Sequence, residues 1–413
     1  MSNPRAISAT EAAAQLGVQV ATLYAYVSRG LIRSENVGDG KRARRYLVED
    51  VAQLTARKRA RRHPAEAVQQ ALHWGTPVMD TRLTLISDGR LIYRGRDATV
   101  LTSAASIEQV AGLLWLGDLN AGEQLFANRF AISPDCRWVL RQLDGLTVTQ
   151  KMQAILPIAG AGDAAAYDLR PSAVIQTGVR IIQLLTAVAT QSSTVHGPLS
   201  EALERHWAPG KPSAAALINA ALVLCADHEL NVSAFTARCV ASSGATPYNV
   251  VTAGLAALHG IRHGAVTGRI EDVWHDLYTQ PTRGTGRVLA DWLKRGEGIP
   301  GFGHVLYPQG DPRAAELIRL MAQAYPKAQV IKQSASLVRA VDALIHQAPT
   351  IDLALVVLAR LLDLPGDGAL TLFALGRTIG WIGHALEQYQ TGQILRPRAR
   401  YVGEPVGAGP EHP

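Results

Sequence analysis

Apolar residues recur at helical spacing through most of the chain after residue 100, with glycines and prolines between one such stretch and the next. No strand-rich region of comparable size is found in the sequence. This pattern predicts a mostly α-helical protein. With 413 residues and 47% apolar side chains, the chain can bury one large core and one small one. The helices expected from the spacing span residues 107–116, 171–191, 214–227, 250–258, 311–325 and 352–363.

Charge is distributed unevenly along the chain. Residues 1–62 contain twelve lysines or arginines and five acidic residues, which accounts for the whole net charge of +7. The other residues carry equal numbers of basic and acidic side chains. A basic segment of this kind is typical of proteins that bind a polyanion, because lysines and arginines release counterions from nucleic-acid phosphates. We therefore expect a separate module in residues 1–62.

The pattern within this module predicts a winged helix-turn-helix. Ser8 and Glu11 have the spacing of a capping box, and Gly17 ends the short helix that follows them. Two short helices joined at a glycine form a helix-turn-helix. The remaining segments are a second helix over 18–30, a small basic wing over 31–47 with a turn at 38–40, and a helix that runs from 48 toward 62.

Several segments of this module resemble the helix-turn-helix of the MerR type. They are residues 21–24 (Ala-Thr-Leu-Tyr), 29–32 (Arg-Gly-Leu-Ile) and 45–51. In that fold the second helix enters the major groove and the wing flanks it on the backbone, so the resemblance implies duplex DNA as a partner. The alternative is a module that only organises an interaction or a dimer, with solvated arginines. The candidate DNA contacts are Gln19, Thr22, Tyr24, Tyr26, Arg29, Arg42, Arg44 and Arg45.

A second group of polar residues lies in the otherwise apolar second half of the chain. Several arginines with a histidine suit a small dicarboxylate, because each guanidinium offers a paired donor fork. An aspartate beside two further histidines suits proton abstraction next to a carbonyl, with a neutral imidazole donating to the enolate oxygen. Carbon–carbon bond formation fits this set better than hydrolysis does. The segments are 226–231, 260–264, 300–304, 311–313, 350–352, 376–381 and 395–398.

These segments resemble the citrate synthase family in their order and in most of their spacing. An early hairpin over residues 84–95 and the helix after it are also similar. The resemblance covers residues 75–403 and implies an all-helical large domain with a small domain inserted at roughly 262–365. Residues 63–74 are then expected to be a linker, and residues 404–413 a flexible tail.

The resemblance implies a reaction and the residues that perform it. Acetyl-CoA would condense with oxaloacetate and water to give citrate and coenzyme A, without a permanently bound cofactor. Closure of the small domain would exclude water from the thioester. The third arginine would serve the neighbouring subunit, which implies a homodimer. The implied residues are His228, Arg313, Arg377 and Arg396 for oxaloacetate, His304 for its ketone, His263 for the thioester carbonyl and the enol, Asp352 as the base, and Ile299, Pro300, Gly301 and Phe302 along coenzyme A.

Two segments depart from the family pattern. Arg262 precedes His263 where an apolar residue is usual, and Leu-Ala-Leu-Val follows Asp352 in place of an aromatic residue, serine and glycine. These changes leave open whether acetyl-CoA or propionyl-CoA is the co-substrate, as in a 2-methylcitrate synthase. A further alternative is a transcription regulator whose synthase-like domain senses oxaloacetate, coenzyme A or citrate.

Structural explanations also exist for single residues in these segments. His228 has the surroundings of a core histidine. Asp352 and Arg377 could form a structural ion pair, and Arg396 could belong to a solvated, charged tail. Outside the matched positions, structural or exposed roles are expected for His259, His346 and His384, and packing support from Asn231, Ser233 and Arg238.

The remaining composition predicts a cytoplasmic protein. No run of eighteen apolar residues and no apolar signal segment is found, so neither a membrane span nor export is expected. The three cysteines (Cys136, Cys225 and Cys239) lack the spacing of a metal site and are expected to be reduced. No metal site is expected.

Overall fold

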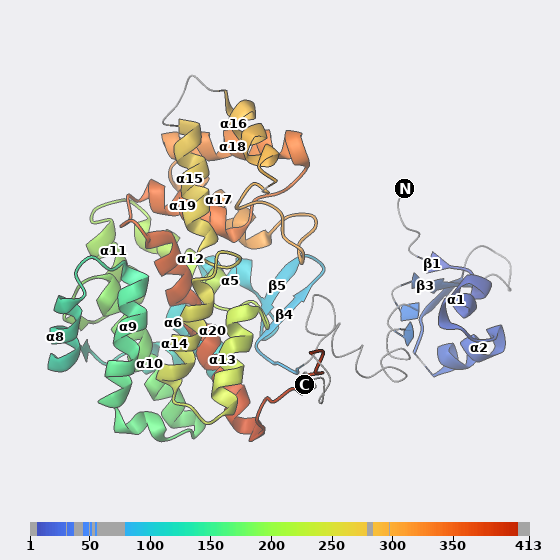
Figure 1. The fold of residues 1–413 in the computed structure, drawn as a ribbon, viewed down its shortest axis with the longest axis horizontal. Helices are drawn as coiled ribbons and strands as arrows, with labels where there is room; N and C mark the ends of the chain where they lie inside the picture. The colour runs from blue at the N-terminus through green and yellow to red at the C-terminus, as the bar shows by residue number, and fades with distance from the viewer. Residues whose placement is uncertain are drawn as a thin grey trace, which may run out of the picture. The chain divides into compact units, whose positions relative to one another are not determined.

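The computed structural model describes residues 6–29, 31–36, 44–48, 50–51, 54–55, 79–278, 284–296 and 298–403. The chain divides into two compact units at residue 80, and each has its own hydrophobic core. Figure 1 shows the N-terminal unit in dark blue and the larger unit in the remaining colours. Several predictions lie outside the described residues: the turn at 38–40, Arg42, most of the helix expected toward residue 62, the linker at 63–74 and the tail at 404–413.

The N-terminal unit contains two helices and a three-stranded antiparallel sheet. The expected capping box is present, because the Ser8 hydroxyl accepts the Glu11 N–H while the Glu11 carboxylate accepts the Ser8 N–H. Gly17 ends the first helix in the left-handed conformation, at φ 60°. The elements are β1 (Ala6–Ile7), α1 (Ala9–Leu16), α2 (Val20–Ser28), β2 (Ser34–Asn36) and β3 (Arg44–Leu47), with the strands in the order β1-β3-β2.

A small shared core holds this unit together. Leu23 of α2, Ile32, Tyr46 of β3 and Val51 have almost no exposed surface. Because these residues come from a helix, the wing and the segment after it, the three parts stabilise one another by burial of apolar surface. The predicted winged helix-turn-helix is confirmed.

The large unit is built almost entirely of helices, as the apolar spacing predicts. Its helices are α5 (Ala98–Ala104), α6 (Ile107–Leu116), α7 (Ala121–Leu125), α8 (Pro134–Gln142), α9 (Val148–Ala161), α10 (Pro171–Ala189), α11 (Leu199–Trp207), α12 (Ala214–Cys225), α13 (Val232–Ser242), α14 (Pro247–Leu258), α15 (Val266–Tyr278), α16 (Thr285–Lys294), α17 (Pro312–Ala324), α18 (Gln329–Ile345), α19 (Ile351–Leu361) and α20 (Gly368–Thr391). The short strands are β4 (Thr84–Ser87), β5 (Arg90–Tyr93), β6 (Arg96–Asp97), β7 (Phe130–Ala131) and β8 (Thr194–Val195).

Helix α20 is the central helix of the large unit and packs against α10, α12, α13 and α14. Two glycines allow α12 and the chain just after it to approach the α20 backbone. A Cβ atom at Gly376 would lie 2.6 Å from the Leu222 carbonyl oxygen, and one at Gly380 would lie 2.5 Å from the Ala226 carbonyl oxygen. Because no side chain fits at either position, α20 lies in direct backbone contact with α12 at Gly376 and with the start of the loop at 226–231 at Gly380.

Helix α10 is long and apolar enough to cross a membrane by length and composition alone. In this fold, however, 78% of its most apolar window is buried against other helices. That degree of burial is typical of the core helix of a globular protein.

Helices α15 to α19 gather at one end of the large unit (Figure 1). Within this group α17 packs on α12 and α5, and α19 packs on α20. The loop at 298–311 meets the loop at 226–231 where the group joins the rest of the unit, and it is hydrogen-bonded to the segment before α19. The candidate site lies at this junction.

Candidate active site

Three histidines from three separate loops converge in the large unit. The rings of His228 and His304 are in edge contact, with centroids 5.3 Å apart. The ring of His263 packs edge-on against Phe373 of α20, and the guanidinium of Arg377 lies 4.9 Å from the centroid of the same phenyl ring. The fold therefore brings together segments that are up to 150 residues apart in the chain.

His228 lies in the loop between α12 and α13 and is nearly buried. Its Nε2 atom is 3.1 Å from the hydroxyl of Tyr307. Burial first, and then the charges of Arg313 and Arg377, hold the pKa of His228 well below its usual value. A neutral imidazole at this position can form hydrogen bonds to a bound oxygen without carrying charge.

His304 is held in one tautomer by its own loop. The backbone N–H of Leu306 donates to Nδ1 of His304 at 3.1 Å, so Nδ1 carries the lone pair and the proton resides on Nε2. Burial lowers the pKa of His304 to about 4, helped by Arg313 and opposed by Asp311. At neutral pH the residue therefore presents a neutral N–H donor.

Backbone hydrogen bonds tie the His304 loop to the segment before α19. The Thr350 N–H donates to the Gly301 carbonyl at 2.8 Å, and the Gly303 N–H donates to the Ala348 carbonyl at 2.9 Å. Both glycines have positive φ, 86° at Gly301 and 76° at Gly303. A Cβ atom at Gly301 would also lie 2.9 Å from the Ile270 side chain. These contacts fix His304 relative to the start of α19.

His263 lies in the turn between α14 and α15. Its Nε2 atom is 2.9 Å from the Ser233 hydroxyl, which also lies 2.8 Å from Oδ1 of Asn231. The Ser233 hydroxyl donates its one proton to Asn231, so Nε2 of His263 donates to the Ser233 oxygen and Nδ1 carries the lone pair. Burial lowers the pKa of His263 to about 3, with Arg377 and Arg313 adding to the effect.

Asp352 lies in the first turn of α19 and is partly buried. Burial raises the pKa of Asp352 to about 6, against the opposing charge of Arg313. The hydroxyl of Thr350 donates to Oδ2 of Asp352 at 3.1 Å and also opposes the rise. An aspartate with this pKa is ionised at neutral pH and is a stronger base than an ordinary carboxylate.

Arg313, at the start of α17, is buried and paired with its own helix cap. Its Nε and Nη2 atoms donate to the two carboxylate oxygens of Asp311 at 2.9 and 2.8 Å. Asp311 also accepts the backbone N–H of Ile351 at 3.0 Å, which links α17 to α19. The pair holds Arg313 in one orientation, with part of its guanidinium left for a further anion.

Arg377 is the clearest anion-binding group of the site. The residue is 1% exposed, and its Nε atom donates to the Cys225 carbonyl at 2.8 Å. Its Nη1 and Nη2 atoms have no hydrogen-bond partner among the described residues. Such donors are costly to leave unpaired in a buried position, so they indicate a carboxylate ligand. No ion pair joins Arg377 to Asp352 within the described part of the chain, which leaves the simple structural explanation unsupported.

Other predicted residues are not brought into this cluster. Arg396 is exposed in the segment after α20. The side chains of Ile299 and Phe302 are 2% and 8% exposed, so this stretch can offer mainly its backbone to a ligand. Pro300 and Gly301 are buried within the same stretch.

In the N-terminal unit, the predicted DNA contacts are mostly accessible. Tyr24 on α2 is 54% exposed. Tyr26 is the exception, because it is half-buried against the small core. The other exposed residues are Gln19, Thr22, Arg29, Arg44 and Arg45.

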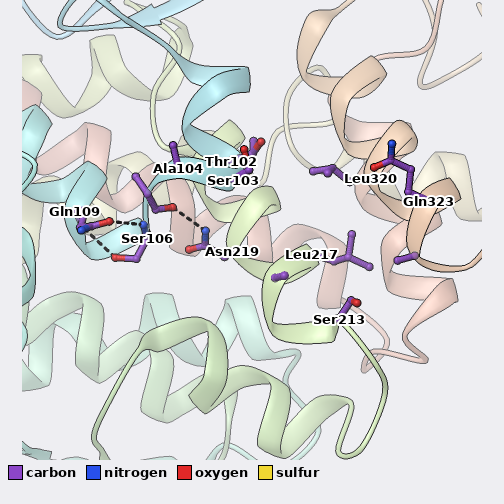
Figure 2. Close-up of a pocket in the computed structure, with 13 residues that line it drawn as sticks. Thr102, Ser103, Ala104, Ser106, Gln109, Ser213, Leu217, Asn219, Leu320 and Gln323 are labelled. Atoms are coloured by element: carbon purple, nitrogen blue, oxygen red, sulfur yellow. Dashed lines mark hydrogen bonds between the residues drawn. The ribbon is translucent and has the colours of Figure 1, made fainter.

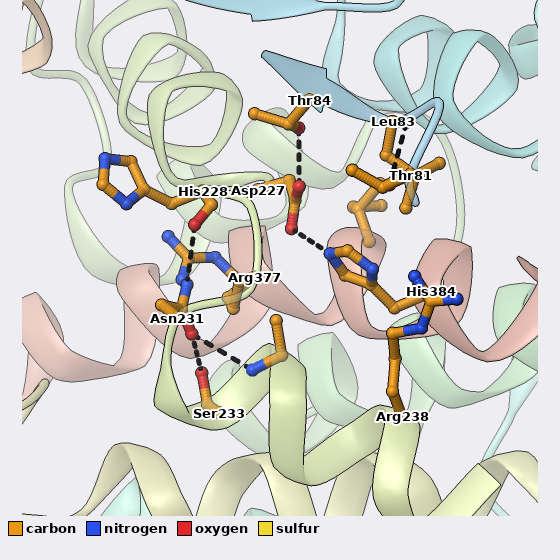
Figure 3. A network of polar contacts seen from close by, with 12 residues as sticks. Thr81, Leu83, Thr84, Asp227, His228, Asn231, Ser233, Arg238, Arg377 and His384 are labelled. Atoms are coloured by element: carbon orange, nitrogen blue, oxygen red, sulfur yellow. Dashed lines mark hydrogen bonds and ion pairs between the residues drawn. The ribbon is translucent and has the colours of Figure 1, made fainter. Parts of the chain in front are cut away.

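Three residues at the site were not predicted to contribute to it. Tyr307 bonds to His228, and no sequence pattern marks it. Asp227 lies beside His228 and pairs with His384 of α20, which was expected only to be structural or exposed (Figure 3). Adjacency to a predicted histidine was the available signal for Asp227.

A cavity of about 730 Å³ lies away from the histidines, between α5, α12 and α17 (Figure 2). Its walls carry hydroxyl and amide groups such as Thr102, Ser106 and Gln323, together with small apolar side chains, but no charged side chain. A dianion would find no cationic partner there. The histidine and arginine cluster is therefore the better candidate for a dicarboxylate.

Known proteins share both parts of the chain. The family described as citrate synthase, C-terminal domain, matches residues 71–398, and the family described as MerR HTH family regulatory protein matches residues 7–63. The citrate synthase of Haloferax volcanii is 29% identical over 361 residues, which cover 80% of this chain and 94% of that protein. The 2-methylcitrate synthase of Shewanella oneidensis is 27% identical over 359 residues, covering 77% and 90%.

Solved structures share the helical fold. The ternary complex of carboxymethyl coenzyme A and oxaloacetate with citrate synthase from Thermoplasma acidophilum has a TM-score of 0.66 at 20% identity. The match covers 82% of this chain and 96% of that one. A similarity at this identity shows that the two chains have the same fold.

Proposed function

Because this chain belongs to the citrate synthase family and is an enzyme of that type, we propose that it condenses acetyl-CoA with oxaloacetate and water to give citrate and free coenzyme A. The observation that carries this proposal is the cluster itself. Two buried arginines, neutral imidazoles and an aspartate of raised pKa face one junction between α12, α17, α19 and α20.

The arginines and His228 bind the dicarboxylate. The open Nη1 and Nη2 atoms of Arg377 take one carboxylate as a bidentate pair. Arg313 and His228 lie near the other polar end. His304 donates its Nε2 proton to the ketone oxygen and makes the ketone carbon more electrophilic.

Asp352 and His263 activate the thioester. Asp352 removes a proton from the methyl carbon of acetyl-CoA, and His263 donates from Nδ1 to the thioester oxygen as the enolate forms. This role requires the Ser233 hydroxyl to turn its proton from Oδ1 of Asn231 to Nε2 of His263, across the 2.9 Å contact, so that the imidazole proton lies on Nδ1. The methylene carbon then attacks the ketone, the ketone oxygen takes the proton from His304, and water cleaves the thioester to release coenzyme A.

The sequence leaves open which acyl-CoA, acetyl-CoA or propionyl-CoA, is the co-substrate. Leu353, Ala354 and Leu355, which follow the base, are fully buried aliphatic residues. We propose acetyl-CoA as the first substrate and propionyl-CoA as the alternative, supported by the 2-methylcitrate synthase relative.

Release of free coenzyme A thiol tests this function directly. The purified protein is mixed with oxaloacetate and either acetyl-CoA or propionyl-CoA, and the thiol is read with a reactive dye. Oxaloacetate-dependent release is expected, and the ratio of the two rates identifies the acyl group. No release together with a thermal shift by oxaloacetate would favour a sensor over an enzyme.

We also propose that the N-terminal unit binds duplex DNA as part of a homodimer. The observations in favour are the exposed Tyr24 on α2 and the exposed Arg29, Arg44 and Arg45. A two-fold dimer would present two such units to a palindromic site. The chain would then be a regulator in which the synthase domain responds to its ligands. The exposed Arg396 would reach the partner's site in the same dimer.

A further inference from the structure

A buried acid and histidine lie directly behind the candidate site. The side chains of Asp227 and His384 have no exposed surface, and Oδ1 of Asp227 is 3.2 Å from Nε2 of His384. The Thr84 hydroxyl of β4 donates to the other oxygen of Asp227 at 2.5 Å (Figure 3). Apolar side chains of similar volume usually stabilise a core as well as a buried ion pair does. Stability alone therefore does not account for a buried carboxylate at this position.

The pair sits where three parts of the chain are clamped together. The Asp227 N–H donates to the Tyr93 hydroxyl at 3.2 Å, and the Gly380 N–H donates to the Ala226 carbonyl at 2.9 Å. A Cβ atom at Gly380 would lie 2.5 Å from Oδ1 of Asp227. The loop at 226–231 therefore cannot shift without moving β4, β5 or α20.

Each residue of this pair lies on the same segment as a residue that is proposed to bind the dicarboxylate. His228 follows Asp227 in the chain. Arg377 precedes His384 by seven residues on α20, which is two helical turns and the same face of the helix. Arg377 bonds to the Cys225 carbonyl and His384 bonds to Asp227, so the same short stretch of chain holds α20 at two points.

The charge of Asp227 also acts on Arg377. Burial lowers the pKa of the Arg377 guanidinium, and Asp227 is the group that opposes this effect most. Burial would likewise raise the pKa of Asp227, but His384 and Arg377 hold it below its usual value. Asp227 thus supplies a resident counter-charge for the arginine that is proposed to bind the substrate.

We propose that Asp227 and His384 are positioning residues for the dicarboxylate site. Their pair fixes the loop of His228 against α20 and aims the free Nη atoms of Arg377 at the substrate carboxylate, without touching the substrate. This inference rests on the proposed function, which supplies the dicarboxylate.

Two substitutions at His384 test the proposal. His384→Leu removes the donor to Asp227, whereas His384→Gln returns an N–H near the position of Nε2. We expect His384→Leu to raise the Kd and the KM for oxaloacetate about tenfold or more, as loss of a hydrogen bond to a charged group does. The KM for acetyl-CoA and kcat should change less than about threefold. His384→Gln should restore oxaloacetate binding to near the original value.

Thr84→Val is the second variant, in case His384→Leu does not fold, because it removes the other hydrogen bond to Asp227 with little change in volume. A matched control is Asp163→Asn. The Asp163 carboxylate accepts bonds from Arg180 at 2.9 Å and Tyr248 at 3.0 Å, beyond the end of α14 remote from His263. The control should lower Tm and leave the KM for oxaloacetate unchanged.

The outcomes are separable. If His384→Leu and Thr84→Val lower Tm as the control does but leave oxaloacetate binding unchanged, the pair is only structural and the proposal is overturned. If the unmodified protein releases no coenzyme A, the proposed function fails, and calorimetric binding of oxaloacetate to the same variants still decides the positioning role.

Discussion

Replacing Thr350 by valine tests how one hydrogen bond sets the pKa of the proposed base, Asp352. The Thr350 hydroxyl donates to Oδ2 of Asp352 at 3.1 Å and makes no capping hydrogen bond to α19. The Thr350 N–H, which holds the Gly301 carbonyl at 2.8 Å, is unaffected by the change. Valine has nearly the same shape, so the main loss is one hydrogen bond to the ionised carboxylate.

The expected effect follows from that bond. The hydrogen bond favours the charged form of Asp352, so its loss raises the pKa above the present value of about 6. A hydrogen bond to a charged group contributes roughly 1.5–3 kcal/mol. Because Asp352 is only partly buried, we expect about half of that free energy. The acid limb of the pH–rate profile should therefore move up by about 0.5–1 pH unit. Because the base must be ionised, the rate falls as pH falls through this pKa.

The assay is coenzyme A thiol release at saturating oxaloacetate between pH 5 and pH 9. At pH 6 the valine variant should be about threefold slower than the unmodified protein, and at pH 8 the two should agree within about twofold. An acid limb that stays in place, with the rate reduced equally at every pH, would refute the assignment of Asp352 as the titrating base.

Three further predictions concern the base, the His304 loop and the N-terminal unit. Asp352→Asn should slow condensation by about 10²–10⁴-fold and leave oxaloacetate binding intact. Because folding raises the pKa of Asp352 from 3.8 to about 6, the ionised carboxylate destabilises the folded protein above pH 6. The free energy of unfolding of the variant at pH 8, measured by urea titration, should therefore be about 1–3 kcal/mol higher than that of the unmodified protein. Gly301→Ala should lower stability by about 1–3 kcal/mol and reduce kcat, since φ is 86° and the new Cβ would meet Ile270; unchanged melting and turnover would contradict the close packing of this loop. Removal of residues 1–62 should leave thiol release intact and abolish the gel shift of duplex DNA, and equal DNA retention by both forms would refute the role of that unit.

Much of the fold follows from local sequence signals. The expected helix at 107–116 coincides with α6, and the capping box at Ser8 and Glu11 is present. Both signals depend on neighbours within a few residues, which the sequence displays directly. The helix expected at 214–227 ends earlier, at Cys225, because Asp227 is drawn toward Thr84 and His384.

The predicted site segments converge, but their finer chemistry depends on contacts that no local pattern encodes. Tyr307 bonds to His228 only because the loop after His304 folds back. The Nη atoms of Arg377 lack a hydrogen-bond partner among the described residues because its burial against α12 pairs only Nε, with the Cys225 carbonyl. Arg396 remains a prediction, since its role requires a second subunit.

The most direct test of the central claim is the formation of a carbon–carbon bond. Acetyl-CoA labelled with carbon-13 at the methyl group is incubated with oxaloacetate and the protein, and the product is followed by NMR. We predict that the label appears in a methylene group of citrate, at the rate of thiol release, and that Asp352→Asn suppresses both. Thiol release that leaves the label in free acetate would contradict the account, because the site would then only hydrolyse the thioester.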